Sequence, residues 1–157
     1  KKKPEARFQL AGMLDEGPDA IDQAELDELI ASGIEFLGPL DDVRPAISAA
    51  SVYVLPSWRE GTPRTVLEAM AMGRPIITTD APGCRETTNN EMNGILVGVK
   101  DAGSLATAMI RLVNEPELRE AMGQRSRMIA EEKYSVESVN AALLQIMSLP
   151  SDNRKDF

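Results

Sequence analysis

Apolar and polar residues alternate in blocks over the first hundred residues of the chain. Short and nearly unbroken apolar runs predict strands over residues 7–12, 34–38, 52–56, 75–79 and 95–98, because strands buried on both faces of a parallel sheet carry such runs. Segments of helical periodicity between them predict helices over 21–32, 42–50 and 63–72, and residues 83–87 fit either a turn or a short helix. This alternation predicts an α/β fold with a Rossmann-like, doubly wound parallel sheet.

After residue 98 the pattern is helical only. One helix is predicted around the apolar stripe of Leu105, Met109 and Leu112, and a second from Pro116 to about residue 133, since proline suits the first helical turn. Ser135 is expected to cap a third helix. Four apolar residues of that helix share a face, which predicts that the face is buried: Val136, Val139, Leu143 and Ile146. The fold therefore ends in a C-terminal helical segment.

The chain shows no internal repeat and no linker rich in proline or glycine. A single domain is predicted over residues 1–148, followed by a polar tail over 149–157. Three lysines open the sequence and the first predicted strand follows almost at once. This abrupt start leads us to expect an N-terminally incomplete domain of a larger protein.

Composition narrows the classes of partner. Seventeen basic and 25 acidic residues give a net charge of −8, so nucleic acid is not expected to bind. The 43% hydrophobic and 27% charged residues are typical of a soluble globular protein, and no apolar run approaches the ~20 residues of a membrane span. The single cysteine, Cys84, cannot form an internal disulfide and fits a reducing cytoplasm.

The chain contains no histidine. Histidine-ligated zinc, Ser-His-Asp catalysis and Cys-His catalysis therefore cannot be assembled from these residues alone. A general base would have to be a carboxylate, a tyrosine or a lysine.

The segment after the strand over 52–56 carries the candidate chemistry, because ligands of open α/β sheets bind beyond the carboxyl ends of the strands. Thr62 is predicted as an N-cap and Pro63 as the first helical residue. A helix that starts here directs free N–H groups and a partial positive charge outward, which suits a phosphate. Arg59 and Arg64 flank this start and are candidates for charge-assisted hydrogen bonds.

Two carboxylates bracket that helix start. Glu60 precedes it and Glu68 lies six residues after Thr62, about 9 Å along the helix axis. A carboxylate accepts paired hydrogen bonds from sugar or ribose diols. The spacing alone is equally compatible with a structural role, in which Glu68 pairs with Arg64 at i,i+4 and Glu60 favours the helix N-terminus.

The stretch from Glu60 to Glu68, EGTPRTVLE, continues as AMAMGRPII. It resembles the E-x7-E signature of the family-4 (group 1) retaining glycosyltransferases. The later segments GCRE at 83–86 and NGILV at 93–97, and Tyr134-Ser135, also match that family's pattern. The resemblance implies one half of a GT-B enzyme, which has two Rossmann-like domains with the active site between them. This chain is similar to the C-terminal, donor-binding domain.

The resemblance implies a role for each matching residue. Glu60 would contact the donor sugar near the reacting carbon and serve as the catalytic residue, while Glu68 would bind the ribose hydroxyls. Backbone N–H groups of Gly61, Thr62 and Arg64 would hold the diphosphate. The base would pack at the loop formed by Gly38, Pro39 and Leu40.

The implied reaction transfers a glycosyl group from a nucleotide sugar, expected to be UDP-linked, in bacterial polysaccharide or glycolipid synthesis. No metal and no cofactor beyond this substrate are expected, since the family needs no bound metal and nothing here resembles a D-x-D site. An Arg/Lys pair of the family and its acceptor-binding N-terminal domain have no match in this sequence. The chain alone is therefore expected to be inactive, and any membrane association would come from that missing part.

Three other functions fit the sequence less well. A nucleotide-sugar epimerase usually employs a histidine, which this chain lacks, and a dinucleotide-dependent dehydrogenase needs a G-x-G-x-x-G loop that does not follow the first strand. A non-catalytic nucleotide-binding module is opposed by the intact Glu60 and Glu68. Tyr53 and Trp58 are predicted mainly as packing residues, and Cys84 as a structural thiol.

Overall fold

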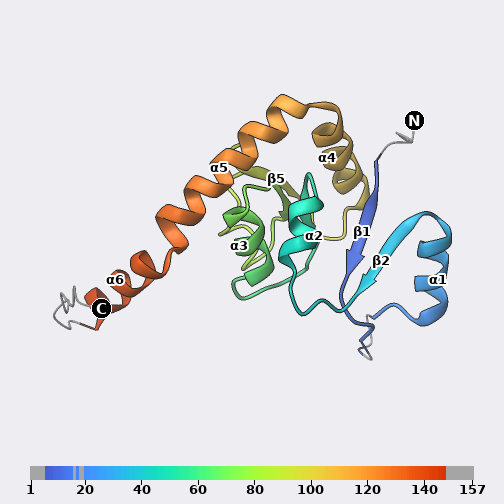
Figure 1. The fold of residues 1–157 in the computed structure, drawn as a ribbon, viewed down its shortest axis with the longest axis horizontal. Coiled ribbons are helices and arrows are strands. Elements are labelled where there is room, and N and C mark those ends of the chain that lie inside the picture. Colours follow the sequence, from blue (N-terminus) through green and yellow to red (C-terminus); the bar gives the residue numbers. More distant parts are fainter. Residues whose placement is uncertain (1–5, 16, 18–19, 148–157) are drawn as a thin grey trace. The chain divides into compact units, whose positions relative to one another are not determined.

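The computed structural model describes residues 6–15, 17 and 20–147. The chain forms two compact units, residues 1–43 and residues 44–157 (Figure 1). The tail predicted over 149–157 lies outside the described residues. Across the described part, no helix has the length and apolar character that would let it cross a membrane.

The first unit is a β-α-β arrangement. Strands β1 (Phe8–Ala11) and β2 (Ile34–Gly38) pair in parallel, with Phe8 opposite Ile34. Helix α1 (Gln23–Ala31) connects them and starts with a capping box, in which Asp22 Oδ1 accepts from the Glu25 N–H at 2.8 Å. Strand β1 is mostly exposed, with only Leu10 partly buried. The prediction that this strand is buried on both faces is therefore wrong within the described residues.

The second unit contains a three-stranded parallel sheet in the order β3-β4-β5. The strands are β3 (Tyr53–Leu55), β4 (Ile76–Thr79) and β5 (Gly94–Val97), and short helices α2 (Arg44–Ala49) and α3 (Arg64–Ala71) lie around β3 in the sequence. All four residues of the central strand β4 are buried, as its unbroken apolar run predicted. Residues 83–87 form turns rather than a regular helix.

Three helices complete this unit: α4 (Ala102–Asn114), α5 (Pro116–Tyr134) and α6 (Val136–Ile146). Pro116 is the first residue of α5, and Ser135 Oγ accepts from the Ser138 N–H at 3.2 Å at the start of α6, both as predicted. The parallel strands with their flanking helices confirm the Rossmann-like α/β fold class.

The core of the second unit lies between the sheet and helices α4 and α5. The stripe of Leu105, Met109 and Leu112 packs against this core as predicted, with Leu112 fully buried. On α3, Val66, Ala69 and Met70 are fully buried. The core cluster itself consists of Ile77, Ile95, Val97, Ala108, Leu112 and Met122.

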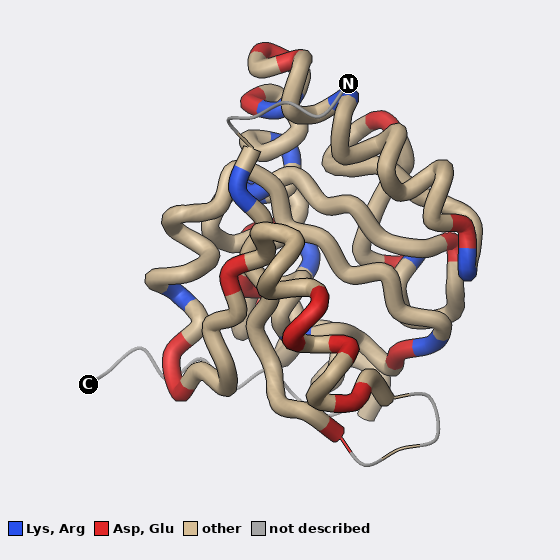
Figure 2. Tube along the Cα trace, turned by 90° about the vertical axis from the view of Figure 1, so that its right-hand side faces the viewer, with Lys and Arg blue, Asp and Glu red and all other residues tan. Residues whose placement is uncertain are grey.

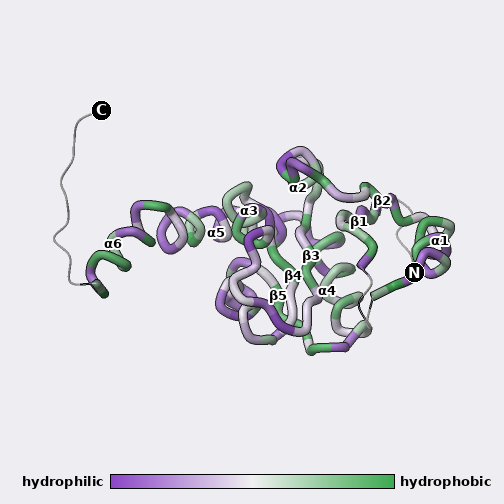
Figure 3. The backbone as a smooth tube through the Cα atoms, turned by 90° about the horizontal axis from the view of Figure 1, so that it is seen from below, coloured by the Kyte–Doolittle hydropathy of each residue, from purple (hydrophilic) through white to green (hydrophobic). Residues whose placement is uncertain are grey.

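The apolar face of α6 does not pack as predicted. Its residues Val136 and Ile146 are 70% and 79% exposed, and Val139 and Leu143 are exposed as well. Helix α6 has no buried residue, and Figure 3 shows it beyond the end of α5, away from β3, β4 and β5. Periodicity predicted the helix and its apolar face correctly, but no described element covers that face.

Candidate functional site

The candidate site lies where β3 ends and α3 begins. In a parallel sheet the carboxyl ends of all strands meet at one edge, so the loop over residues 56–63 shares this edge with the segments that follow β4 and β5. Glu60, Gly61, Thr62 and Arg64 all belong to this loop or to the first turn of α3.

The start of α3 differs by one residue from the prediction. Pro63, with extended backbone angles of φ −70° and ψ 106°, is the N-cap, and no side chain caps the helix. Its carbonyl accepts from the N–H groups of Val66 and Leu67. Thr62, predicted as the N-cap, therefore stands one position outside the helix, because the proline carbonyl already begins the helical hydrogen bonds.

This uncapped start leaves donors available. Among the described residues, the N–H groups of Gly61, Thr62, Arg64 and Thr65 donate to no acceptor. Unpaired N–H groups at a helix start carry a partial positive charge and form an anion-binding arrangement. The geometry at α3 therefore suits an anion such as a phosphate group.

Two buried threonines of β4 hold the loop that follows β3 by hydrogen bonds. The Thr78 hydroxyl donates to the Leu55 carbonyl at 2.7 Å, and the Thr79 hydroxyl donates to the Ser57 carbonyl. Further along, the Glu60 N–H donates to the Pro82 carbonyl at 3.0 Å. The backbone that carries Glu60 is thus held by the central strand and by the turn that follows it.

That turn must approach the loop closely at Gly83. Its φ is +85°, and an added Cβ would lie 2.1 Å from the Glu60 carbonyl oxygen and 2.3 Å from that of Gly61. Only glycine fits this position. Glu86 accepts from the Gly83 N–H at 2.7 Å, and the Tyr134 hydroxyl donates to the Glu86 carbonyl at 2.9 Å. The segments around Gly83 and Tyr134 therefore support the loop that carries Glu60.

Neither candidate carboxylate forms an ion pair with another described residue. Glu60 is partly buried and Glu68 is exposed. Within the described part of the chain, neither forms an ion pair or a side-chain hydrogen bond, and the same holds for Arg59 and Arg64. The structural alternative for Glu68, an i,i+4 pair with Arg64, is therefore not formed.

Tyr53 lies near both glutamates. Burial raises the pKa of this half-buried phenol on β3, a hydrogen bond with the Thr65 side chain lowers that pKa, and the charges of Glu68 and Glu60 raise it. Both carboxylates therefore lie within electrostatic range of one hydroxyl group. Sequence reasoning treated Tyr53 as a packing residue and missed this position.

Trp58 is exposed rather than packed. Its side chain is 48% exposed, and the Lys100 ammonium lies 3.7 Å from the ring centroid in a cation–π contact. Lys100 itself has a φ of 59°, in the left-handed region. Cys84, in contrast, is a fully buried free thiol, in line with the structural role predicted for it.

The remaining predicted residues belong to the first unit. Gly38 ends β2 with a φ of +68°, and its carbonyl accepts from the Gly12 N–H at 3.0 Å. Pro39 is exposed and Leu40 is partly buried. These three residues form the loop beyond the carboxyl end of β2, which is the expected edge for a ligand.

The positive charge available to an anion at the candidate site comes only from groups close to it. The basic residues are scattered along the trace (Figure 2), and the net charge of the chain is −8. An anion at α3 would therefore depend on backbone N–H groups and on Arg59 and Arg64 nearby. No group of three or more cysteine, aspartate or glutamate side chains in the described residues is arranged to hold a metal ion.

The sequence and the fold of this chain are similar to those of known proteins. The family model described as "Glycosyl transferases group 1" matches residues 1–115. The chain is 34% identical, over 74% of its length, to N,N'-diacetylbacillosaminyl-diphospho-undecaprenol alpha-1,3-N-acetylgalactosaminyltransferase of Campylobacter jejuni, and it spans 30% of that enzyme.

Two further proteins are similar over different shares of the chain. UDP-Gal:alpha-D-GlcNAc-diphosphoundecaprenol alpha-1,3-galactosyltransferase of Escherichia coli is 34% identical over 51% of this chain, which spans 21% of that enzyme. The crystal structure of Anabaena HepE in complex with UDP aligns with a TM-score of 0.82 and 21% identity, covering 93% of this chain and 42% of HepE. The chain thus spans well under half the length of each of these proteins.

Proposed function

Because the chain belongs to the group 1 glycosyltransferases, we propose that it binds a nucleotide-diphosphate sugar and is the donor-binding part of a retaining enzyme. The observation that carries this proposal is the start of α3. It combines unpaired N–H groups for a diphosphate with two carboxylates, Glu60 and Glu68, that no cation of the described residues neutralises.

Each group has a role that its position supports. The N–H groups of Gly61, Thr62 and Arg64 bind the diphosphate and stabilise it as it leaves, since donors aimed at developing negative charge lower the barrier. Glu68 accepts hydrogen bonds from the ribose hydroxyls. Glu60, held by the Pro82 carbonyl through its own N–H, contacts the donor sugar, where positive charge develops as the leaving group departs. The resemblance to the family supports Gly38, Pro39 and Leu40 of the first unit as the residues that pack on the base.

We propose UDP as the nucleotide. The Escherichia coli relative is named for a UDP-Gal donor, and HepE was crystallised with UDP. The Campylobacter and Escherichia coli relatives are both named for undecaprenol-diphosphate acceptors. These names support a hexosyl transfer to an acceptor of bacterial polysaccharide or glycolipid synthesis, and we propose that it takes place in the cytoplasm.

In this proposal UDP binding needs no metal ion, whereas sugar transfer needs more of the enzyme than this chain. The helix start supplies the positive potential that a metal would otherwise provide, so UDP binding does not depend on a divalent ion. Transfer does depend on more than these 157 residues, which span 30% of the Campylobacter relative. The acceptor-binding domain and the family's Arg/Lys pair belong to that remainder, so this chain alone binds UDP without transferring sugar.

A calorimetric titration of the 157-residue chain with UDP tests the proposal. Glu68→Gln should weaken UDP binding about tenfold, the range expected on weakening hydrogen bonds to a charged acceptor. Glu117→Gln, which removes the same charge from an exposed position in the first turn of α5, should leave UDP affinity unchanged. EDTA should leave the wild-type affinity unchanged.

Three results would count against the proposal. If titration with UDP up to millimolar concentration produces no heat of binding, the proposed nucleotide site is contradicted. If Glu68→Gln binds UDP with the same affinity as the wild type, the proposed ribose contact of Glu68 is contradicted. A large loss of affinity with EDTA would show that a metal ion holds the diphosphate.

A further inference from the structure

The second unit has a cavity of about 640 Å³. It lies at the other edge of the three-stranded sheet from the candidate site. Ser51 and Pro75, which line it, precede β3 and β4, so the cavity is at the amino ends of these strands. The other walls come from the end of α3 and the first half of α5. Three arginines line it, Arg74, Arg119 and Arg127, and we refer to it as the arginine cavity.

A close contact between two glycines brings these arginines together. Gly73 follows α3 with a φ of +68°, and a Cβ added at Gly123 on α5 would lie 2.3 Å from the Gly73 carbonyl oxygen. Arg119 and Arg127 lie four residues before and after Gly123, so all three share one face of α5. Arg74 directly follows Gly73. The backbone contact therefore places the three guanidinium groups around one space.

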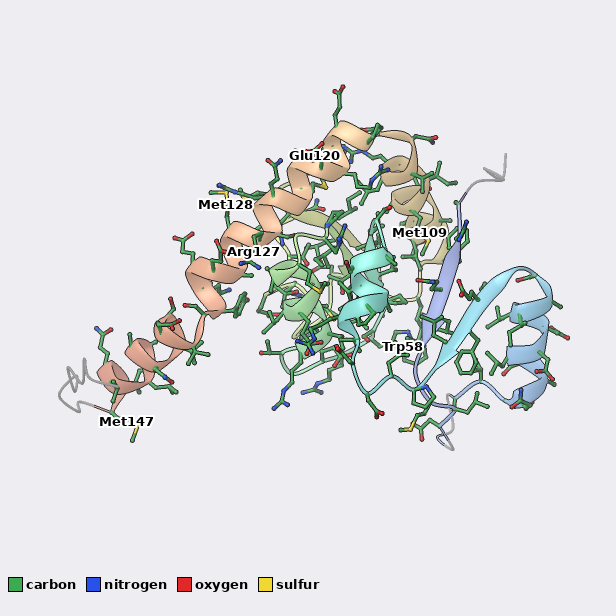
Figure 4. All side chains as sticks on the ribbon, in the orientation of Figure 1. Trp58, Met109, Glu120, Arg127, Met128 and Met147 are labelled. Atoms are coloured by element: carbon green, nitrogen blue, oxygen red, sulfur yellow. The ribbon has the colours of Figure 1, made fainter. Side chains whose placement is uncertain are left out.

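Each guanidinium is already oriented by a backbone carbonyl. Arg74 donates to the Ser48 carbonyl at 3.0 Å and Arg119 to the Leu112 carbonyl at 2.8 Å. Arg127 donates to the Ala71 carbonyl at the end of α3, and Figure 4 shows it extending from α5 on that side. These bonds stabilise helix ends. Each of these bonds uses one of the five donors of a guanidinium, and Arg127 uses a second, its Nε, on Glu131. Every guanidinium is thus held in place with donors left over.

The charges of this cluster are incompletely neutralised. Arg127 pairs with Glu131 at 2.6 Å. Arg74 and Arg119 form no ion pair with any carboxylate of the described residues, and the buried Nε of Arg74 has no hydrogen-bond partner there. One acidic residue, Glu120, lines the same cavity. A buried charged donor without a partner is costly.

We propose that the arginine cavity binds a small anion that carries a phosphate group, at a place separate from the α3 site. Guanidinium groups form paired hydrogen bonds to phosphate oxygens. The first turn of the 19-residue helix α5, including Pro116, lines the same cavity and adds the positive end of a helix dipole. The volume falls within the ~300–1,000 Å³ usual for small-molecule sites, which leaves room for more than the phosphate group itself.

Pyrophosphate is the probe, titrated calorimetrically at about 50 mM salt into the 157-residue chain saturated with UDP, so that the diphosphate site proposed at α3 is already occupied. Gln124→Glu adds a negative charge to the cavity wall and leaves all three arginines in place. It should weaken pyrophosphate binding by about tenfold or more, since like charges a few ångströms apart repel strongly. Arg125→Gln changes the net charge equally at the neighbouring exposed position, which does not line the cavity. It should change the affinity less than about twofold.

Three further measurements complete the test. UDP affinity should be the same in Gln124→Glu and wild type, which separates this cavity from the α3 site even if one of the two proposals fails. Arg119→Gln should also lose pyrophosphate binding, with its thermal melting recorded because Arg119 also stabilises the end of α4. Sedimentation with phosphatidylglycerol and phosphatidylcholine vesicles shows whether the phosphate belongs to a lipid headgroup: binding to the anionic vesicles that Gln124→Glu abolishes supports that source. The proposal would be overturned if the wild type bound neither pyrophosphate nor vesicles. It would also be overturned if Gln124→Glu left both kinds of binding unchanged.

Discussion

At the scale of single residues, the spacing between Arg64 and Glu68 does not decide the role of Glu68. Its distance from Arg64 suits a helical ion pair as well as a ligand, and the sequence could not choose between them. The structure forms no such pair among its described residues, and it sets Glu68 and Glu60 within electrostatic range of Tyr53. Tyr53 could not be identified from the sequence, because its relation to Glu68 exists only after β3 and α3 have packed together.

The surroundings of Tyr53 predict a loss of stability at alkaline pH. Burial, with the charges of Glu68 and Glu60, raises the pKa of Tyr53 in the folded protein. The unfolded chain therefore releases this proton first as the pH rises above the ordinary tyrosine value near 10. The contribution of Tyr53 to the free energy of unfolding is complete below that ordinary value and is lost as the pH rises through the pKa of the folded protein. Urea unfolding between pH 8 and pH 11 measures this loss.

The variant Tyr53→Phe isolates this contribution. It cannot titrate at this position, so its free energy of unfolding should fall less steeply above pH 10 than that of the wild type. Loss of the hydrogen bond with Thr65 lowers its stability at every pH and does not alter this slope. Parallel curves for the two proteins would show that the phenol titrates alike in the folded and unfolded states.

At the scale of elements, the hydrophobic pattern located the five strands and the helices α1, α2, α3 and α5 to within one or two residues, and it predicted α4 and α6 without complete bounds. Strand β2 was predicted at 34–38 and is observed there, and α5 starts at Pro116 as predicted. The start of α3 was displaced by one residue, because backbone hydrogen bonds to Pro63 decided it rather than the preference of Thr62 for the N-cap. The burial of α6 was wrong, because periodicity identifies an apolar face without identifying what covers it.

The packing of α3 against α5 gives a prediction at this scale. Gly123→Ala should destabilise the protein by about 2 kcal/mol or more, because the new Cβ would lie 2.3 Å from the Gly73 carbonyl oxygen and must force the helices apart. Gly103→Ala on α4 is the matched control, since its Cβ meets only an Asp101 carboxylate oxygen at 3.4 Å. Helix propensity alone should then stabilise it by up to about 1 kcal/mol.

Urea unfolding of both variants measures this difference. Equal effects of the two substitutions would show that α3 and α5 do not approach as closely as the glycine contact requires. The same result would remove the structural basis of the arginine cavity, since that contact gathers its three arginines.

At the scale of the whole molecule, the edge that carries the candidate site was predictable and the arginine cavity was not. Parallel strands place their carboxyl ends together, so the loop after 52–56 could be chosen from the strand pattern alone. Arg74 and Arg119 are 45 positions apart in the sequence, and no local pattern relates them. Only the contact of α3 with α5 makes them neighbours, and such contacts are set by the packing of the complete fold.

The different roles proposed for the two glutamates predict different kinetics in a two-domain enzyme, of which this chain is proposed to be the donor-binding part. A ribose contact exists before and during the reaction, so Glu68→Gln should mainly weaken binding of the nucleotide sugar and raise KM. The contact of Glu60 lies at the sugar, where positive charge develops in the transition state. Glu60→Gln should therefore lower kcat by about tenfold to a hundredfold, while UDP affinity changes less than about threefold.

Steady-state kinetics and UDP titrations on both variants distinguish these effects, with Glu117→Gln as the control for a lost surface charge. If both glutamates served only the start of α3, each substitution would cost at most ~1 kcal/mol of stability and would leave kcat and UDP affinity at wild-type values. A loss of UDP affinity in Glu60→Gln as large as that in Glu68→Gln would instead place both carboxylates on the nucleotide. Only a separation of kcat from affinity between the two variants supports a sugar contact for Glu60, because binding that is equal in the ground state and the transition state leaves kcat unchanged.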